Sequence, residues 1–472
     1  MQRLFLKKNP RVGPAAPSRY QIWHRGADGS EREMRLTGFS YYGEISGLRP
    51  RPLDRFVELV PDGQVIDEDW RSALGNDAST RVLMTYGQWM AFLFDHHINH
   101  SRIFVFPEVA VKAHPFARYP AGHPKAGKFD LNTPSDPFFG RLRRYLGLAR
   151  RKGIVVQISF ASIQSLRDKP KEENDADWNA HPFNAKNNGH GFIVTPDDPR
   201  DPDDQRPGGI PHFCRIQEPG GAADTVPEKL YEAQKRMVDW IVDAAKPYWN
   251  VMFEIFNEPN HNLAGAENWH FQVARWLDAR LREPGAGERS HLVTLNAPDE
   301  LLRHDRAKGS ILRALLLQNG QRRAVPLVDV FQFHGSQWGG PSGAQKCENR
   351  PNPKPTPEEV ANITRLARAA VNGFYGRFVD PAGTIPIEGS RIAVICDGDA
   401  HYKAQDNPGV YAGVASSLGL SYIHRWSECH LSQGKLKAQA AALKQAVPRE
   451  HAPRADPTPA PAFEEVLEEE FA

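Results

Sequence analysis

The feature that most constrains the fold is a regular alternation of short β-type runs with helical patterns. Eight runs rich in β-branched and aromatic residues recur, at residues 37–42, 101–106, 153–160, 250–256, 291–295, 328–333, 391–396 and 420–423. Segments with helical hydrophobic spacing lie between several of them, at 87–97, 139–151, 227–245, 269–281 and 357–372. Alternating strands and helices imply parallel pairing through right-handed crossovers. Eight such units predict an α/β fold closed into a (β/α)8 TIM barrel, and no Gly-x-Gly-x-x-Gly follows the first strand to favour a dinucleotide-binding sheet.

Three long insertions follow strands rather than helices. Residues 107–137, 161–227 and 335–357 are rich in Pro, Gly, Asn, Asp and His. Loops that follow strands emerge at the carboxyl-terminal face of a barrel, where barrel active sites lie. The sequence therefore predicts a barrel with long inserted βα loops around its site.

The chain divides into three parts on this interpretation. Residues 1–36 form an N-terminal extension and residues 37–446 form the catalytic barrel. Residues 447–472, with Pro/Ala runs and an acidic end, are expected to be a disordered tail. The alternative for this tail is a docking motif.

Charge and cysteine content narrow the classes of partner. Lys and Arg number 59 against 57 Asp and Glu, so the net charge is +2 and gives no long-range field for nucleic acid or anionic lipid. We expect no nucleic acid and no membrane partner. The four cysteines are scattered and are expected to be free thiols. No signal peptide and no run of about 20 apolar residues is present. This predicts a soluble protein, cytoplasmic by sequence, or secreted or periplasmic if a leader is missing; the oligomeric state stays open.

The segment with the clearest chemistry is the end of the fourth strand, where an apolar run stops at Asn257-Glu258-Pro259. Proline ends strand pairing, so Glu258 is expected at the carboxyl-terminal lip of the barrel. Cleavage of a glycosidic bond needs a proton donor and a second carboxylate that stabilises or captures the sugar cation. Asn257 is suited to bind a sugar 2-hydroxyl. Glu254 shares a strand face with Glu258 and is expected to point into the barrel.

This arrangement resembles the clan A retaining glycoside hydrolases, the cellulase-like (β/α)8 superfamily. The resemblance implies that Glu258 is the acid/base. A second match is Asn99-x-x-Arg102 at the second strand, which implies that Arg102 lies under the active site and orients the second carboxylate. The alternative for Arg102 is an ordinary ion pair at the barrel rim.

Two further positions match the same family. His334 ends the sixth strand, where the family often carries a His or Tyr near the nucleophile, and Trp426 follows the eighth, where the family often has an aromatic floor for the sugar. A structural role is the alternative for His334. Core or rim packing is the alternative for Trp426.

The seventh strand departs from the family pattern. The family usually has a Glu there as nucleophile, but this chain reads Arg-Ile-Ala-Val-Ile-Cys-Asp-Gly-Asp-Ala from residue 391. Asp397, the first residue after the apolar run, is the expected nucleophile, and Asp399 is the second choice. A simple Asp-Gly turn is the alternative.

The second insertion carries a polar cluster at residues 178–192. His181 and Asn188 are its candidate sugar-binding residues, because imidazole and amide groups both donate and accept hydrogen bonds. An Asx-rich loop of purely structural role fits equally well. No metal site and no cofactor are expected.

The resulting hypothesis is a retaining glycoside hydrolase that cleaves O-glycosidic bonds of an oligo- or polysaccharide by double displacement. Asp397 attacks the anomeric carbon, Glu258 protonates the leaving oxygen, and the two carboxyl groups are expected about 5–5.5 Å apart. Two alternatives remain. One is a glycan-binding barrel without catalysis, and the other is a metal-dependent barrel hydrolase or lyase.

Overall fold

The chain folds into a closed eight-stranded barrel. The computed structural model describes residues 2–8, 20–40, 57–60, 82–106, 114–162, 164–166, 178, 181–191, 213–219, 225–257, 266–282, 288–297, 317–318, 321–322, 326–334, 392–397, 408–417, 419–425, 433–446 and 448–456. The barrel strands are all parallel and follow the chain order around the ring. They are β4 (Thr37–Ser40), β7 (His100–Phe104), β10 (Val155–Ser159), β11 (Val251–Glu254), β12 (Leu292–Ala297), β15 (Val330–His334), β16 (Ala393–Asp397) and β17 (Ser421–Arg425). The predicted (β/α)8 TIM barrel is confirmed, and each predicted strand overlaps one barrel strand.

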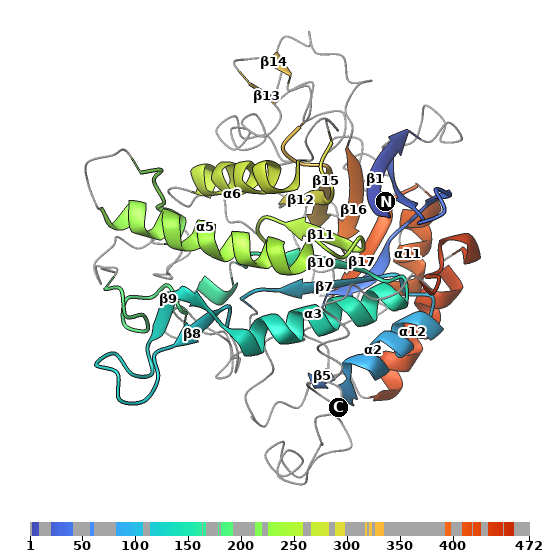
Figure 1. Cartoon of the computed structure of the whole chain (residues 1–472). Coiled ribbons are helices and arrows are strands. Elements are labelled where there is room, and N and C mark those ends of the chain that lie inside the picture. Colours follow the sequence, from blue (N-terminus) through green and yellow to red (C-terminus); the bar gives the residue numbers. More distant parts are fainter. Residues whose placement is uncertain are drawn as a thin grey trace, which may run out of the picture.

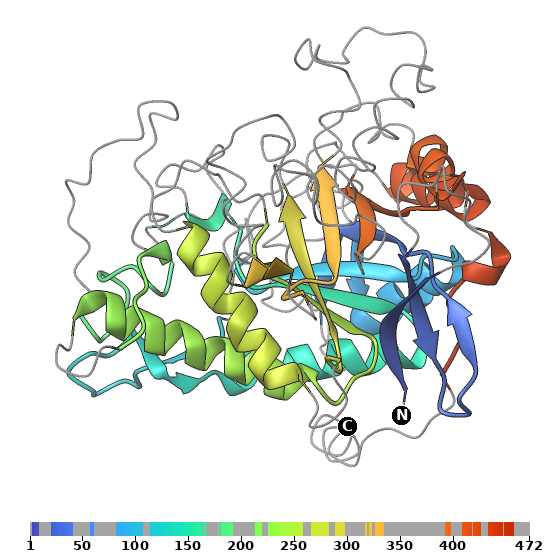
Figure 2. The same ribbon diagram turned by 90° about the horizontal axis from the view of Figure 1, so that it is seen from above.

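Helices pack around the outside of this barrel, as Figures 1 and 2 show. They are α2 (Tyr86–Asp95), α3 (Asp136–Arg151), α5 (Val226–Ala245), α6 (Ala266–Leu281), α11 (Pro408–Ser417) and α12 (Gln433–Ala446), with 3-10 turns η1 (Gln164–Leu166) and η7 (Arg449–His451). The start of α5 is fixed by a capping box, in which Thr225 and Glu228 satisfy each other's backbone N–H groups. Four predicted helical segments are confirmed; the fifth, 357–372, lies outside the described residues.

The apolar side chains form two separate clusters because side chains alternate across each strand. Val156 and Phe253 point outward and join the large cluster between strands and helices. Val155 and Met252 point inward and join a smaller cluster that fills the amino-terminal half of the barrel. The barrel is thus a packed core at its amino-terminal end.

An N-terminal antiparallel sheet closes that end of the barrel. It consists of β1 (Arg3–Lys8), β2 (Tyr20–Arg25) and β3 (Glu31–Glu33). Leu4, Leu6 and Ile22 of this sheet belong to the same apolar cluster as the inward-facing barrel residues. The predicted N-terminal extension therefore includes a three-stranded lid on the amino-terminal face. Smaller strand pairs lie elsewhere: β5 (Val57–Val60) with β6 (Val82–Thr85), β8 (Phe116–Arg118) with β9 (Phe129–Pro134), and β13 (Leu317–Gln318) with β14 (Gln321–Arg322).

Residues 448–456 also pack against the amino-terminal face, so the prediction of a disordered tail from 447 is wrong for this stretch. The side chain of Asn99 donates to the backbone oxygen of His451 at 2.7 Å. The carboxylate of Asp456 accepts from Trp249 at 2.8 Å and from Gln2 at 3.2 Å. These buried polar partners explain why a Pro-rich sequence is held in place. Residues 457–472 lie outside the described part of the chain.

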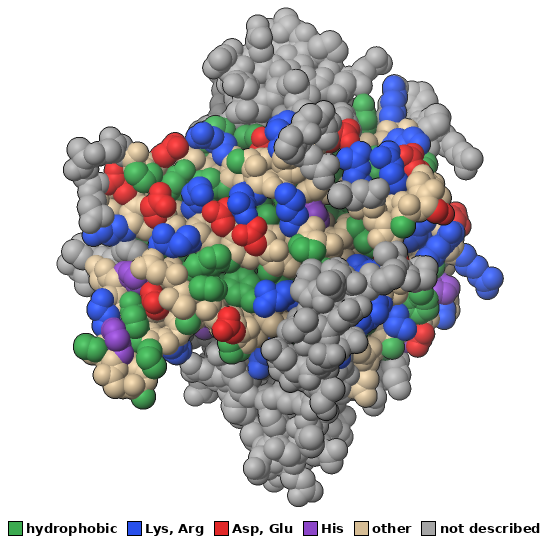
Figure 3. Space-filling view, viewed as in Figure 1, with side chains coloured by type: hydrophobic (Ala, Val, Ile, Leu, Met, Phe, Trp, Pro, Cys, Tyr) green, Lys and Arg blue, Asp and Glu red, His purple; other side chains and the backbone are tan. Residues whose placement is uncertain are grey.

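Opposite charges are interspersed on the described part of the face in Figure 3. On α5 and α6, Lys235 pairs with Asp239 at 3.0 Å, and Arg280 pairs with Asp243 and Asp239. Cys214 and Cys396 are buried free thiols, as predicted for the cysteines that the structure describes. A search of the described helices finds none with both the length and the apolar character of a membrane span.

Candidate active site

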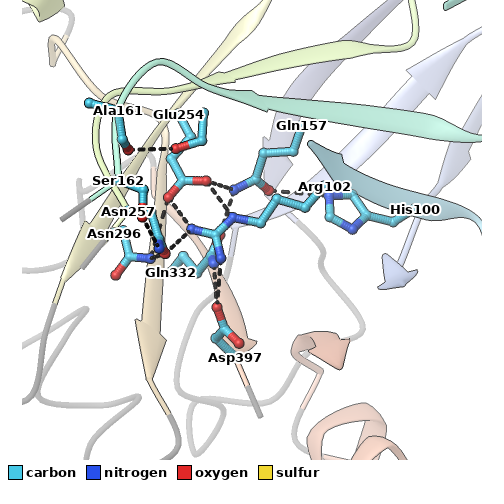
Figure 4. Close-up of polar contacts among 11 residues, drawn as sticks. His100, Arg102, Gln157, Ala161, Ser162, Glu254, Asn257, Asn296, Gln332 and Asp397 are labelled. Carbon is cyan, nitrogen blue, oxygen red and sulfur yellow. Dashed lines mark hydrogen bonds and ion pairs between the residues drawn. The ribbon is translucent and has the colours of Figure 1, made fainter. Parts of the chain in front are cut away.

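A layer of polar side chains lies inside the barrel directly above the apolar cluster. Each member stands two residues beyond an inward-facing apolar residue, and so shares its face: Gln157 follows Val155, Glu254 follows Met252, Gln332 follows Val330, and Asp397 follows Ile395. Figure 4 shows these side chains converging from different strands. We call this set, with Arg102 and Asn296, the polar layer.

Arg102 of β7 is the centre of the polar layer. Its side chain is fully buried, and the ring of Phe104 lies 4.9 Å from its guanidinium carbon. The guanidinium donates to Glu254 through two nitrogens, to Asp397 through Nη1 at 3.2 Å and to Asn257 through Nη2 at 2.6 Å. One cation therefore connects the carboxyl ends of β11 and β16 across the barrel (Figure 4).

Glu254 is the counterion of Arg102. It is fully buried, and each of its carboxylate oxygens accepts two hydrogen bonds. Oε2 accepts from Arg102 at 2.6 Å and from Gln157 at 2.7 Å, and Oε1 accepts from Arg102 and from Asn296 at 3.3 Å. The prediction that Glu254 points into the barrel is confirmed. Two-pronged pairing of this kind fixes the plane of the guanidinium.

Asp397 is the last residue of β16 and is also fully buried. Its Oδ2 accepts from Arg102 at 3.2 Å and from the side-chain amide of Gln332 at 2.6 Å. A charged donor and a neutral donor thus meet on one oxygen. Together the two hydrogen bonds restrict the rotation of the carboxylate.

A chain of amides leads from Asp397 back across the barrel. Because Gln332 donates to Asp397, its oxygen must accept, and it does so from Gln157 Nε2 at 2.6 Å. The oxygen of Gln157 lies 3.2 Å from His100 Nε2, so that nitrogen carries the proton. Burial lowers the pKa of His100 to about 3, with Arg102 acting in the same direction, so the ring is neutral at ordinary pH. The direction of every hydrogen bond in this chain is therefore determined.

Asn257 lies just beyond β11, where its backbone N–H donates to Ala161 at 2.7 Å. Its side-chain oxygen accepts from Arg102, and its nitrogen donates to the hydroxyl of Ser162 at 3.1 Å. The residue before Glu258 is thus tied both to the guanidinium and to the end of β10.

The surroundings of Asp397 hold neutral groups with raised pKa values. Burial raises the pKa of the Cys396 thiol and the Tyr422 hydroxyl, and the charge of Asp397 adds to both shifts. The guanidinium of Arg102 contacts Asp397 directly. Within the described part of the chain, no group of three or more His, Cys, Asp or Glu is arranged to hold a metal ion.

The predicted site residues fall into four groups, of which His181 and Asn188 form the last. Arg102, Asn257 and Asp397 are brought together. His334 ends β15 in register with Asp397, but only its backbone is described. Glu258, Asp399 and Trp426 lie outside the described residues, so their predicted roles and the expected carboxyl separation stay predictions.

His181 and Asn188 are not part of the polar layer. The amide nitrogen of Asn188 donates to the backbone oxygens of Pro182 and Asn184, and its oxygen accepts from the backbone of His190. His181 is buried among aromatic rings, with Phe106 at 4.4 Å and Trp178 at 5.2 Å, and burial holds its pKa well below the usual value. Their described contacts build the loop itself, which is the structural alternative considered for this insertion.

Sequence reasoning missed Gln157, Gln332, Asn296 and the role of His100 in the polar layer. A usable signal existed for the two glutamines. Each is a lone amide in the middle of an otherwise apolar strand, Val-Val-Gln-Ile-Ser and Val-Phe-Gln-Phe-His. A buried amide in such a run needs a polar partner from a neighbouring strand.

Comparison with solved structures gives matches at low sequence identity. The endo-1,4-beta-mannanase from Rhizomucor miehei aligns with a TM-score of 0.47 and 11% identity, over 94% of this chain and 99% of that one. The beta-mannanase from the blue mussel Mytilus edulis gives 0.44 and 12%, over 96% and 98%. Endo-glycoceramidase II from Rhodococcus sp., solved as a lactosyl-enzyme intermediate, gives 0.42 and 13%, over 86% and 76%. No protein-family model and no curated protein sequence matches the chain. The argument for function therefore rests on this chain's own side chains.

Proposed function

We propose that this protein is a retaining glycoside hydrolase, with Asp397 as nucleophile and Glu258 as acid/base. The observation that carries the proposal is the shared guanidinium of Arg102. It contacts Asp397 at the end of β16 and Asn257, the residue immediately before Glu258. A fully buried cation that holds these two strand ends together fits a site in which two carboxyl groups act on one sugar.

The proposed reaction has two steps. An oxygen of Asp397 forms a bond to the anomeric carbon while the glycosidic bond breaks and Glu258 gives its proton to the departing oxygen. Water then attacks the same carbon, Glu258 takes a proton from that water, and the bond to Asp397 breaks.

The side chains around the carboxylates have supporting roles in this proposal. Arg102 holds Asp397 in its orientation before attack. Asn257 has a second amide hydrogen besides the one donated to Ser162, and this hydrogen is assigned to the sugar 2-hydroxyl. His334 and Trp426 remain the candidates for contacts to the sugar ring.

The proposal is tested with a panel of aryl glycosides and β-linked polysaccharides. Asp397→Asn is expected to lose hydrolysis of every substrate that the parent cleaves, by about 10³-fold or more. Glu258→Gln is expected to lose activity on poor leaving groups while it still reacts with activated aryl glycosides, because only the former need a proton donor. The matched control is Asp329→Asn, which alters an Asp–Arg pair at the opposite end of the barrel and is expected to retain activity.

A second candidate function is a barrel that binds glycans without cleaving them. The full burial of Asp397 and its pairing with Arg102 favour this alternative, because a purely structural ion pair has the same features. A 2-deoxy-2-fluoro glycoside with a good leaving group separates the two. A covalent adduct on Asp397, located by peptide mass spectrometry, supports the hydrolase. Binding of the sugar without any adduct supports the non-catalytic barrel.

A further inference from the structure

We infer that Gln332 is a positioning residue for Asp397 and that the amide chain through Gln157 and His100 sets its orientation. This inference rests on the proposed function, in which Asp397 is the nucleophile. Asp397 thus has a second hydrogen-bond donor besides the guanidinium of Arg102, namely the neutral side-chain amide of Gln332 on β15. The two donors reach Asp397 from different strands and meet on the same oxygen, Oδ2.

The contact between Gln332 and Asp397 is the shorter of the two. The amide nitrogen lies 2.6 Å from Oδ2, whereas the guanidinium nitrogen lies 3.2 Å away. Arg102 is shared with Glu254 and Asn257, so its position is a compromise among three acceptors. Among the described contacts, the amide nitrogen of Gln332 donates to Asp397 alone, because the other hydrogen bond of Gln332 is accepted by its oxygen. It is therefore the better placed group to fix the rotation of the carboxylate.

A free glutamine amide can flip and present oxygen instead of nitrogen. Here the flip is opposed, because it would turn the Gln332 oxygen toward Asp397 and place its NH2 against the NH2 of Gln157. Gln157 is held in turn by donation to Glu254 at 2.7 Å and by the proton on His100 Nε2. The chain thus keeps a donor aimed at the nucleophile.

His100 occupies its place because β4 supplies a glycine beside it. A β-carbon added at Gly38 would overlap the carbonyl oxygen of His100 and come within 2.5 Å of its Nδ1. The absence of a side chain at Gly38 lets the imidazole lie at the end of the amide chain. The orientation of Gln332 therefore depends on a position on β4, across the barrel.

The first experiment compares Gln332→Leu with the parent. Several other groups surround Asp397: Arg102 from β7 contacts it, Glu254 contacts that arginine, and Cys396 and Tyr422 are close enough to feel its charge. All of them are kept in this variant. Loss of one donor to a carboxylate raises its pKa, so the acidic limb of the pH profile for inactivation by a 2-deoxy-2-fluoro glycoside should move up by about one pH unit. The rate on the acidic limb should fall about 10-fold.

The matched control is Gln234→Leu. Gln234 is also a fully buried glutamine with two hydrogen bonds, to Phe213 at 2.8 Å and from Trp269 at 2.6 Å, but it lies on α5 outside the barrel. Both variants are expected to lose comparable stability, because each removes two buried hydrogen bonds, and only Gln332→Leu should move the pH profile. Equal shifts in both variants, or a shift in neither, would overturn the inference.

A second variant covers the case in which Gln332→Leu fails to fold. A second measurement reports on Asp397 without any substrate. Gln332→Glu is nearly isosteric and places a second acid beside Asp397, so the apparent pKa of the pair should rise further than in the leucine variant. Titration of ¹³C-labelled aspartate carboxyls by NMR, with Asp397→Asn to assign the signal, reports the same ionisation without substrate. If no glycoside reacts with the parent, the proposed function fails, and the NMR titration alone decides whether Gln332 acts on Asp397. An unchanged NMR titration in both Gln332 variants overturns the inference.

Discussion

Arg102 shows how much a single buried side chain can determine. It has no exposed surface and neutralises Glu254 while it contacts Asp397 from the same guanidinium. Two carboxylates around one arginine are stable inside a barrel only if the arginine remains, because an unpaired buried charge is costly. The energetic role of Arg102 is therefore separate from any role in catalysis.

Arg102→Met is expected to destabilise the fold by about 3–5 kcal/mol, since it leaves both carboxylates without their cation. Urea unfolding followed by circular dichroism measures the change. Arg280→Met is the control, because it removes an arginine that pairs with two carboxylates on the surface, where such pairs contribute about 0–1 kcal/mol. Equal losses in the two variants would contradict the buried pairing of Arg102.

At the same scale, the sequence predicted some site residues and not others. Arg102, Asn257 and Asp397 were predicted because each stands at a strand end or in a short motif. Gln157 and Gln332 were missed because the sequence of one strand does not reveal how far along the barrel axis a given residue lies. Only the register, which pairs Gln157 with Arg102 and Asn296 with Gln332, brings these side chains to one level.

Strands β4 and β7 illustrate a constraint that acts between elements. Gly38 faces His100 across the pair, and the two positions fit only because one of them has no side chain. Glycine is required at position 38 because the two strands approach each other closely there, and not because of its backbone angles.

Gly38→Ala is expected to cost at least about 1–3 kcal/mol, because the new methyl group would overlap the backbone of β7. Gly140→Ala in α3 is the control. Nothing lies within 4 Å of a β-carbon built there, so it should stabilise the protein by about 0.5–1 kcal/mol through its better helix propensity. Thermal unfolding of the two variants tests the opposite signs.

The elements differ in how far the sequence alone reveals them. The eight barrel strands were predicted because each is a compact apolar run followed by loop residues. The sheet β1–β3 was not predicted, since Arg-Leu-Phe-Leu-Lys-Lys and Glu-Arg-Glu are largely charged. Their few apolar side chains are buried only because the open end of a barrel lies beneath them. Tertiary packing of this kind leaves little trace in local composition.

For the whole molecule, acid sensitivity follows from histidines that are buried in the neutral form. Burial lowers the pKa of His100 to about 3 and that of His291 to about 4, below the ordinary value. Between pH 6.5 and these values the unfolded chain binds more protons than the folded one. Stability is therefore fully present above pH 6.5 and declines as the pH falls toward 4.

Each such histidine should contribute a slope of up to about 1.4 kcal/mol per pH unit in this window. His291→Gln is expected to reduce the dependence of the unfolding free energy on pH by the contribution of one histidine. Urea unfolding at a series of pH values measures this change. A parent protein whose stability does not change between pH 6.5 and 4 would contradict the neutral burial.

The amino-terminal face also depends on the C-terminal segment. A chain ending at Asp456 keeps the contacts of residues 448–456 and is the reference for the comparison. A chain ending at Val447 loses the contacts of His451 with Asn99 and of Asp456 with Trp249, and its Tm should fall by several degrees. Differential scanning calorimetry of the two truncations gives the comparison, and equal Tm values would show that residues 448–456 contribute nothing.

The hydrogen bond between Gln2 and Asp456 brings the first and last described residues into contact on the face opposite the polar layer. A circular permutant can therefore join these positions with a very short linker and open the chain elsewhere. For the same reason, a module fused to residue 2 or to residue 456 would begin at the rear of the barrel. A fused binding module would then leave the carboxyl-terminal end of the barrel, where substrate is expected to enter, unobstructed.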